Sequence, residues 1–314
     1  MFTYFLRRLG SSVVLLLVVS LLTFSLVNVS GGLSVARGIL GPLASDDQVQ
    51  QKASDLGLLD PFFVRFGAWL MDAVTGDLGR SWFTSEQVTD VLIQRLPVTL
   101  AVSLTTVVVT ALLSLLLGIA AAVYRGWVDR VVQIIAVLGF ALPGFWVALM
   151  LVSLLAVKTR LLPATGYIAL GDSVTGWIST MTLPVASLAI GSVAATAQVL
   201  RGSMIDVLRS DFVRTLRASG LSESRVLLRH ALRNAASPTL TVLSLQFIGL
   251  LGGTVIIEKV FALPGIGSIA ETATANGDLP LILGVVVLMV VIVIVVNLLI
   301  DLINGFLNPK VRLS

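Results

Sequence analysis

Six long stretches without a charged residue constrain this chain more than any other feature of its sequence. Each is about 20 residues or longer, the length that a helix needs to cross a hydrocarbon core about 30 Å thick. Backbone groups in lipid must pair within their own segment, so these stretches predict helices rather than strands. The six windows are residues 9–28, 96–124, 131–157, 180–200, 239–257 and 279–300.

The composition excludes water-soluble globular proteins and disordered chains. Hydrophobic residues make up 56% of the 314 residues, charged residues make up 12%, and the mean hydropathy is +1.01. A soluble domain of this kind would expose large apolar patches, and a disordered chain needs a polar composition. We therefore expect an all-α polytopic membrane protein with six transmembrane helices, the first retained and not cleaved as a signal peptide.

Basic residues are distributed unevenly between the two sides of the membrane. Six spans place both termini on one side, and that side holds 13 of the 21 Lys and Arg residues. The positive-inside rule then predicts that both termini are cytoplasmic. The 13 residues are Arg7, Arg8, Arg125, Arg130, Arg201, Arg209, Arg214, Arg217, Arg225, Arg229, Arg233, Lys310 and Arg312.

The connection between the first two windows, residues 30–95, has helix signals of its own. Ser45 and Gln48 form a capping-box pattern, and Gly57 suits the end of that helix. Pro61 is typical of the first position of a second helix. We expect a small helical extracytoplasmic cap, which could be a packing plug or a docking surface for a delivering protein.

The connection between the fourth and fifth windows, residues 201–238, predicts two short cytoplasmic helices. The first begins near Ser210 and ends near Ala218, and Gly220 allows the chain to reverse. The second begins near Ser222 and leads to Pro238, which is expected as the first residue of the fifth span.

Three arginines recur every four residues on the second of these helices and predict one cationic stripe. A stripe of this kind can lie against lipid phosphates, and it can also belong to a knob that inserts into a cytoplasmic partner. A helix-turn-helix that reads DNA is disfavoured because the membrane holds both ends, so no nucleic-acid partner is expected. The stripe consists of Arg225, Arg229 and Arg233.

Several absences narrow the function further. No window carries a charge, which argues against a proton- or sodium-driven carrier. The chain has no phosphate-binding loop, no cysteine and one histidine, so no catalytic residue, metal site or bound cofactor is expected. The polar residues Gln198, Gln246 and Asn297 are of a kind that more often joins helices than binds ligands. These features favour a transport subunit that obtains its energy from a partner over a stand-alone channel or secondary carrier.

Several motifs resemble the membrane-spanning permeases of ATP-binding-cassette (ABC) importers of the dipeptide, oligopeptide and nickel type. Residues 211–220 (DFVRTLRASG) and 229–235 (RHALRNA), followed by Pro238, are similar to the coupling motif of that family. Leu216, Ser219 and Ser237 depart from the usual pattern. Further matching stretches are LGL at 56–58, GDLGRS at 76–81, LP at 162–163 with GY at 166–167, and VFALPGIG at 260–267.

The resemblance implies partners and a coupling site. The partners would be a second homologous permease, two cytoplasmic ATPase subunits that bind ATP and Mg²⁺, and an external substrate-binding protein that delivers a peptide; nickel or another small solute is the alternative cargo. This subunit would contact membrane lipid and would not itself be an enzyme. The implied coupling residues are Phe212, Arg214, Thr215, Leu216, Arg217, Ala218, Gly220, Arg225, Arg229, Arg233 and Pro238.

The resemblance also implies a layout and a location. Residues 1–29 would form the N-terminus and first span, residues 30–95 the cap, and residues 96–314 the core permease domain. The location would be the bacterial cytoplasmic (inner) membrane, which the chain crosses several times.

Two prolines are expected to bend spans. Pro143, followed by Gly144, lies within the third window, and Pro184 lies one turn inside the fourth. Proline removes a backbone hydrogen bond and permits a kink. Such kinks could allow the helices to rock during transport, or they could be static features of packing.

Overall fold

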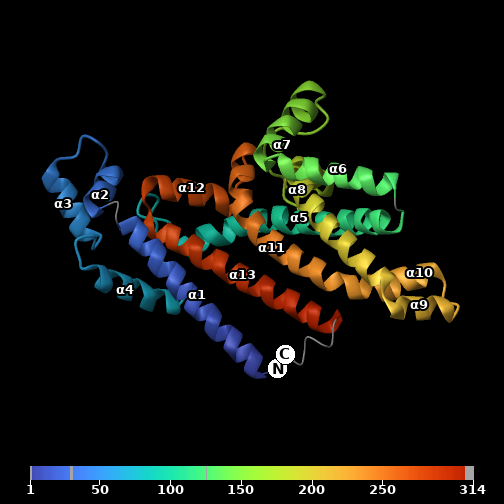
Figure 1. Cartoon of the computed structure of the whole chain (residues 1–314). Helices are drawn as coiled ribbons and strands as arrows, with labels where there is room; N and C mark the ends of the chain where they lie inside the picture. The colour runs from blue at the N-terminus through green and yellow to red at the C-terminus, as the bar shows by residue number, and fades with distance from the viewer. Residues whose placement is uncertain (1, 29–30, 125, 308–314) are drawn as a thin grey trace. The chain divides into compact units, whose positions relative to one another are not determined.

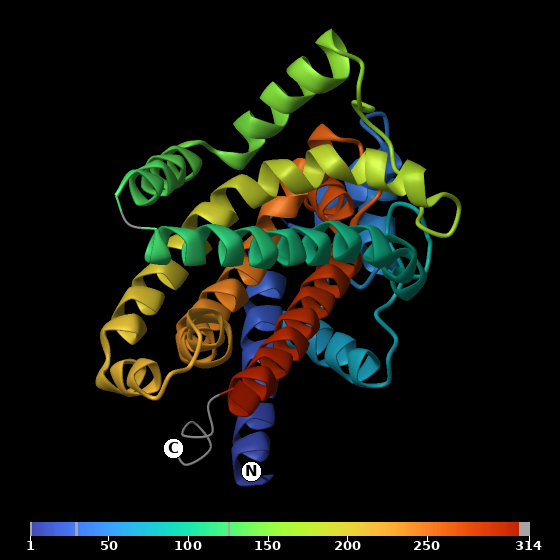
Figure 2. The same cartoon turned by 90° about the vertical axis from the view of Figure 1, so that its right-hand side faces the viewer.

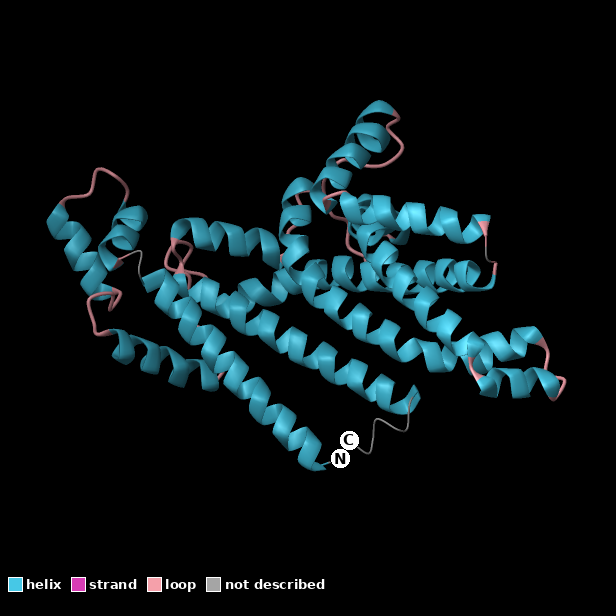
Figure 3. Ribbon diagram, in the orientation of Figure 1, coloured by secondary structure: helices cyan, strands magenta, loops and turns pink. Residues whose placement is uncertain are grey.

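The structure, a computed structural model, describes residues 2–28, 31–124 and 126–307. Arg125, Lys310 and Arg312, which contribute to the predicted orientation, lie outside the described residues. Within these ranges the chain is helical, with one isolated antiparallel bridge between Arg80 and Gln87 and no strand (Figure 3). The predicted all-α class is confirmed.

Five helical segments are long and apolar enough to cross a membrane, and a bent pair of helices would make a sixth. The segments lie in α1 (Phe2–Asn28), α5 (Val88–Val123), α8 (Val174–Arg209), α11 (Leu232–Val260, with the turns before it) and α13 (Leu279–Leu307). Each contains one of the predicted windows, except that α5 ends one residue before the end of the window 96–124; Figure 1 labels these helices. The polytopic architecture therefore follows the hydropathy pattern.

The third window is not a single helix. It forms α6 (Trp127–Ala141) and a second piece, α7 (Gly144–Leu151) with the π-helical η1 (Val152–Lys158), and the two are bent by 98°. Leu142 is extended at φ −93°, ψ 121°, as expected of a residue before proline. Figure 2 shows the two pieces meeting at this corner. The predicted kink within one span is thus a corner between two separate helices.

The predicted start of the fifth span at Pro238 is wrong. The helix runs without interruption from α10 (Glu223–Arg225) through the π-helical η2 (Val226–Ala231) into α11, and Pro238 lies inside it. A proline inside a membrane helix is tolerated where neighbouring groups satisfy the backbone. The second short helix and the fifth span are therefore one element of 38 residues.

The connection after α1 forms α2 (Gly32–Leu40), α3 (Asp46–Asp55) and α4 (Phe62–Val74). The capping box is confirmed: Ser45 Oγ accepts from the Gln48 N–H, and the Gln48 side chain accepts from the Ser45 N–H. Gly57 ends α3 with φ +65°, and α4 begins one residue after Pro61. Helix α2 and helix α12 (Ile266–Asn276), in the connection before α13, had no predicted counterpart.

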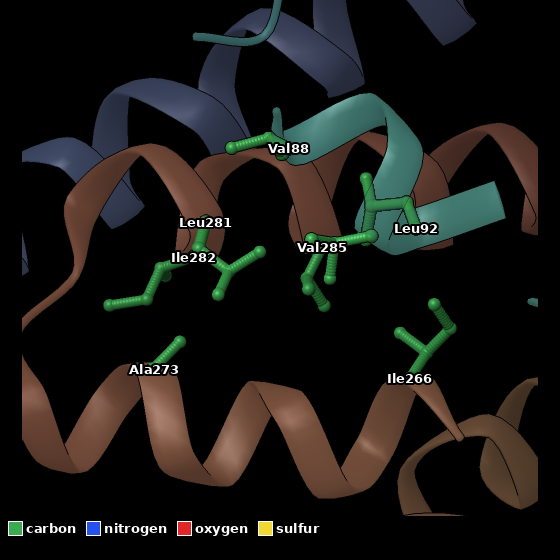
Figure 4. Close-up of a cluster of buried hydrophobic side chains, with 8 residues drawn as sticks. Val88, Leu92, Ile266, Ala273, Leu281, Ile282 and Val285 are labelled. Carbon is green, nitrogen blue, oxygen red and sulfur yellow. The ribbon is translucent and has the colours of Figure 1, made fainter. Parts of the chain in front are cut away.

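The chain folds into two compact units, residues 1–98 with 264–294 and residues 99–263 with 295–314. In the first unit, the start of α5 packs with α12 and α13, as Figure 4 shows for Val88, Ile266 and Ile282. Gly284 makes this possible, because a Cβ there would lie 2.3 Å from Val88. Glycine thus allows α13 to approach α5 closely.

In the second unit, one face of α5 is built from small hydroxyl side chains that are fully or almost fully buried. They recur at three- and four-residue spacing, which places them on a single face. Small residues of this kind let membrane helices pack closely and form hydrogen bonds between them. The face consists of Thr99, Ser103, Thr106, Thr110 and Ser114.

Candidate coupling and transport site

The connection between α8 and α11 is a helical hairpin. Helix α9 (Asp211–Ala218) packs against η2, and Val213 and Val226 are completely buried. Gly220 reverses the chain at φ +77°, while the Leu221 N–H donates to the Leu216 carbonyl at 3.3 Å. Figure 1 shows α9 and α10 lying side by side at the ends of α8 and α11. The predicted first helix and its glycine turn are confirmed, whereas the second helix is the beginning of the 38-residue element that contains the fifth span.

Two ion pairs hold the hairpin charges in different ways. Arg217 binds Glu223 with two hydrogen bonds, Nε to Oε1 at 2.7 Å and Nη2 to Oε2 at 3.1 Å. Arg214 pairs with Asp211 at 3.1 Å, and both of these side chains are largely exposed. Arg217 therefore joins the two arms of the hairpin, whereas an exposed pair such as Arg214–Asp211 contributes little to stability.

The arginine stripe lies partly on a π-helix. Arg225 ends α10, Arg229 lies in η2, and Arg233 lies in α11; all three are exposed. A π-helix has more residues per turn than an α-helix, so the angle around the helix axis between residues four positions apart differs in η2 from that in an α-helix. The three guanidinium groups thus share one side of the helix without forming a straight α-helical row.

The remaining predicted coupling residues divide into two groups. Phe212, Thr215 and Ala218 are exposed on α9, and Leu216 is partly buried. Pro238 is also exposed, but it lies inside α11, beyond η2. The hairpin therefore brings the α9 residues and Gly220 together, while Pro238 belongs to the membrane helix.

A polar cluster joins α8 to α6 about two helical turns before α8 ends. Arg201 of α8 forms a two-fold ion pair with Asp129 of α6: its Nε contacts Oδ1, and its Nη2 contacts Oδ2 at 2.7 Å. Gln133 also donates to Asp129, at 3.0 Å. Both members of the pair are mostly buried, so the cluster fixes the start of α6 against α8.

An apolar cleft of about 420 Å³ lies between α6 and α8. Its one polar lining residue is Gln198, which is partly buried and for which the described residues offer no hydrogen-bond partner within reach. Gln198 is one helical turn before Arg201, and Ala141 of the lining is two residues before Pro143. The apolar lining residues are Ala136, Val137, Phe140 and Ala141.

The other two polar residues of the spans join helices, as predicted. Gln246 accepts a hydrogen bond from Ser192 at 3.4 Å, which links α11 to α8. Asn297 accepts from Ser244 at 2.8 Å. Gln198 differs from both because it lines the cleft between α6 and α8.

Family models match nearly the whole chain. The model described as "Binding-protein-dependent transport system inner membrane component" matches residues 114–313, and the model of the corresponding N-terminal region matches residues 1–105. The chain belongs to this family. It is thus a permease subunit of a binding-protein-dependent transport system in the inner membrane, as the motifs around Gly220 indicated.

Curated relatives and a solved structure agree with this assignment. A putative peptide transport system permease of Brucella abortus is 36% identical over 98% of both chains, and a probable peptide ABC transporter permease of Sinorhizobium fredii is 36% identical over 98% of this chain and 99% of its own. The glutathione transport system permease GsiC of Escherichia coli K12 is 35% identical over 99% of both chains. A structure of the MetNI methionine ABC transporter in inward-facing conformations matches with a TM-score of 0.56 and 15% identity, covering 70% of this permease and 97% of that chain.

Sequence reasoning missed two buried carboxyl groups of the permease. Asp278, 2% exposed, accepts hydrogen bonds from Ser81 Oγ at 2.5 Å and from the Trp82 N–H at 3.2 Å. Glu258 is completely buried in α11 and accepts from Thr99 Oγ1 at 2.6 Å. Asp278 stands directly before α13, a typical helix-cap position, which could have revealed it. Glu258 lies one residue beyond the fifth window, so the helix is longer than its charge-free part.

The proline positions of the permease behave differently from each other. Pro143 directly precedes α7 at the 98° break, and Gly144 is the first residue of α7. Pro184 is buried, and α8 runs through it without interruption while Ser187 Oγ donates to its carbonyl at 2.7 Å. The structure therefore supports a corner at Pro143 and a continuous helix at Pro184.

The corner can be measured with two spin labels. The permease contains no cysteine, and Val131 and Val157 are both exposed, so Val131→Cys and Val157→Cys can carry the labels. One straight helix would separate them by about 39 Å, whereas the observed bend gives about 25 Å. We expect pulsed-EPR distances in the assembled transporter near the shorter value. A distribution centred near 39 Å in all nucleotide states would contradict the corner.

Proposed function

We propose that this permease translocates peptides, most simply di- or oligopeptides, as the membrane-spanning subunit of an ABC importer. The observation that carries the proposal is the helical hairpin of residues 211–225, placed between two membrane helices of a chain that belongs to this family. A hairpin with exposed apolar and cationic side chains is suited to dock on a separate ATPase. The names of relatives at 36% identity over 98% of the chain support a peptide as cargo.

The same proposal assigns the partners. A second homologous permease completes the translocation path, two ATPase subunits bind ATP and Mg²⁺ and dock on the hairpin, and an external binding protein delivers the peptide. No catalytic residue or bound cofactor is assigned to the permease itself. Both termini and the hairpin face the cytoplasm, in line with the positive-inside distribution of Arg and Lys.

Uptake by cells tests the proposal directly. Cells that lack only this permease should lose ATP-dependent uptake of labelled di- or tripeptides, and the restored gene should return it. Co-isolation of the permease with an ATPase subunit is expected. If peptide uptake is unchanged and nickel uptake is lost, the proposed substrate is wrong and nickel takes its place. If the purified permease alone carries out gradient-driven flux, the proposed importer function is wrong.

Gln198 is the residue we propose to contact the peptide in transit. A primary amide both donates and accepts, so it can pair with a peptide bond, while the apolar cleft wall accommodates a side chain. We expect Gln198→Met, which keeps the size but loses the amide, to raise the transport KM about tenfold, the equivalent of about one or two hydrogen bonds.

The matched control is Gln246→Met, which removes an amide that contacts Ser192 instead of the cleft. Its uptake per inserted molecule should keep the original KM. An unchanged KM in the Gln198 variant would remove this residue from the proposed path and leave the importer assignment intact.

A further inference from the structure

Helix α4 is apolar over most of its circumference, because its two charged residues lie seven positions apart on one side. Of its 13 residues only Arg65 and Asp72 are charged, and the sequence FFVRFGAWLMDAV contains three phenylalanines and a tryptophan. A helix with so wide an apolar surface ordinarily packs that surface against protein or inserts it into a membrane. None of the α4 residues, however, is fully buried in the structure.

One side of α4 packs against the end of α1. Phe24 contacts Phe62 and Phe66 edge-to-face, with ring centroids 5.2 and 5.4 Å apart. Arg65 donates to Asn28 Oδ1 at 2.7 Å and lies over the Phe24 ring at 5.5 Å. Burial lowers the pKa of Arg65, and the negative charge of Asp60 opposes that effect.

These contacts fix the depth of α4 in the membrane. Asn28 ends the first span, and Phe24 lies four residues, or about 6 Å, inside that end. Packing on Phe24 therefore places α4 at the level where the hydrocarbon meets the head groups. Trp69 and Trp82 pack in the same cluster, and tryptophan is enriched at this level.

The opposite side of α4 is an exposed apolar face. Phe63 is 79% exposed, Met71 is 72% exposed and Val74 is 80% exposed, and Val64, 59% exposed, lies at the edge of the same side. At 13 residues the helix is about 20 Å long, too short to cross the bilayer. The exposed face must therefore meet an apolar surface that runs along the helix.

The lipid bilayer is the surface that continues along α1. Only 11% of the apolar window of α1 is buried, and the exposed Leu21 and Leu17 lie on the same side of α1 as Phe24, one and two helical turns before the α4 contact. The lipid-facing surface of α1 is therefore continuous with the exposed apolar face of α4. A helix that is too short to span the bilayer and carries a tryptophan at this depth is suited to lie in the plane of the membrane interface.

We infer that α4 is an in-plane membrane anchor, whose Phe63, Val64, Met71 and Val74 face inserts into the lipid leaflet at the Asn28 end of α1. The orientation proposed above makes this the outer leaflet. The anchor holds the cap helices α2 and α3 at a fixed height above the lipid. This goes beyond the transport function, because it assigns a lipid-binding surface to the cap.

Spin-label accessibility tests the anchor in the assembled transporter in lipid nanodiscs. The cysteine-free chain allows one label at Met71→Cys and a matched label at Gln50→Cys, an exposed position on α3. Oxygen concentrates in lipid, and a neutral nickel chelate concentrates in water. We expect the Met71 label to relax at least threefold faster with oxygen than with the nickel chelate, and the Gln50 label to show the reverse.

Two results would overturn the inference. A Met71 label as accessible to the nickel chelate as the Gln50 label would place α4 in water. A Met71 label that neither reagent reaches would show that a protein, such as the second permease or the binding protein, covers the face. Both results are independent of peptide uptake, which is measured on the same variants.

Discussion

We expect Gly220→Val to lower ATP-driven uptake at least tenfold, while the permease still inserts into the membrane at its normal level. The backbone at Gly220 has φ +77°, a conformation that costs an ordinary residue about 1–2 kcal/mol and a β-branched residue more. A Cβ at this position meets nothing within 4 Å, so the strain is purely conformational. The turn must change, and α9 then moves relative to η2 on the surface proposed to dock on the ATPase.

The matched controls isolate the backbone effect. Gly202 also has open space around its Cβ position, but it lies in α8 without a positive φ, so Gly202→Val should transport normally. Gly220→Asn should recover part of the uptake, because asparagine tolerates the left-handed region. The measurement is peptide uptake with ATPase co-isolation per inserted permease. Full uptake by normally inserted Gly220→Val would refute the role of this turn.

Asp278→Leu lowers the amount of folded permease in the membrane severalfold. The carboxylate is the acceptor for the Ser81 hydroxyl and the Trp82 N–H, and Ser81 Oγ in turn accepts from the Thr84 N–H at 3.1 Å. Leucine fills the volume but leaves two buried donors without an acceptor, at about 1–3 kcal/mol each. Losses of this size change protein abundance severalfold in cells.

Asp77→Leu is the comparison variant for this prediction. Asp77 also accepts a backbone hydrogen bond in the same loop, from the Gly79 N–H at 2.8 Å, but it is exposed. Its replacement should change the thermal midpoint of the detergent-solubilised permease by much less than Asp278→Leu does. Equal shifts of the thermal midpoint for the two variants would show that burial of the Asp278 carboxylate does not increase its contribution to stability.

The membrane helices and the hairpin were predictable because their signals are local. Hydropathy over about 20 residues locates a span, and Gly220 marks its turn within a few residues of sequence. The same holds for the capping box at Ser45 and Gln48. In each case the residues that decide the structure are neighbours in the chain.

The missed features depend on distant residues or on competing effects at one residue. Asp278 and Ser81 are 197 positions apart, so no local pattern connects them. Pro143 and Pro238 carry the same backbone constraint, yet one begins a new helix after a 98° corner and the other lies inside a continuous helix. Leu142, before Pro143, adopts an extended backbone, whereas the helix continues through Pro238. The presence of a proline alone therefore does not predict whether a helix breaks.

The uninterrupted helix from Glu223 to Val260 makes the hairpin one end of a rigid lever. At 38 residues it is about 57 Å long, so a tilt of about 5° about one end displaces the other by about 5 Å. No loop between η2 and α11 can absorb such a movement. A small rotation of the hairpin about a nearby pivot is thus delivered, enlarged, to the far end of the fifth span, where Glu258 is buried.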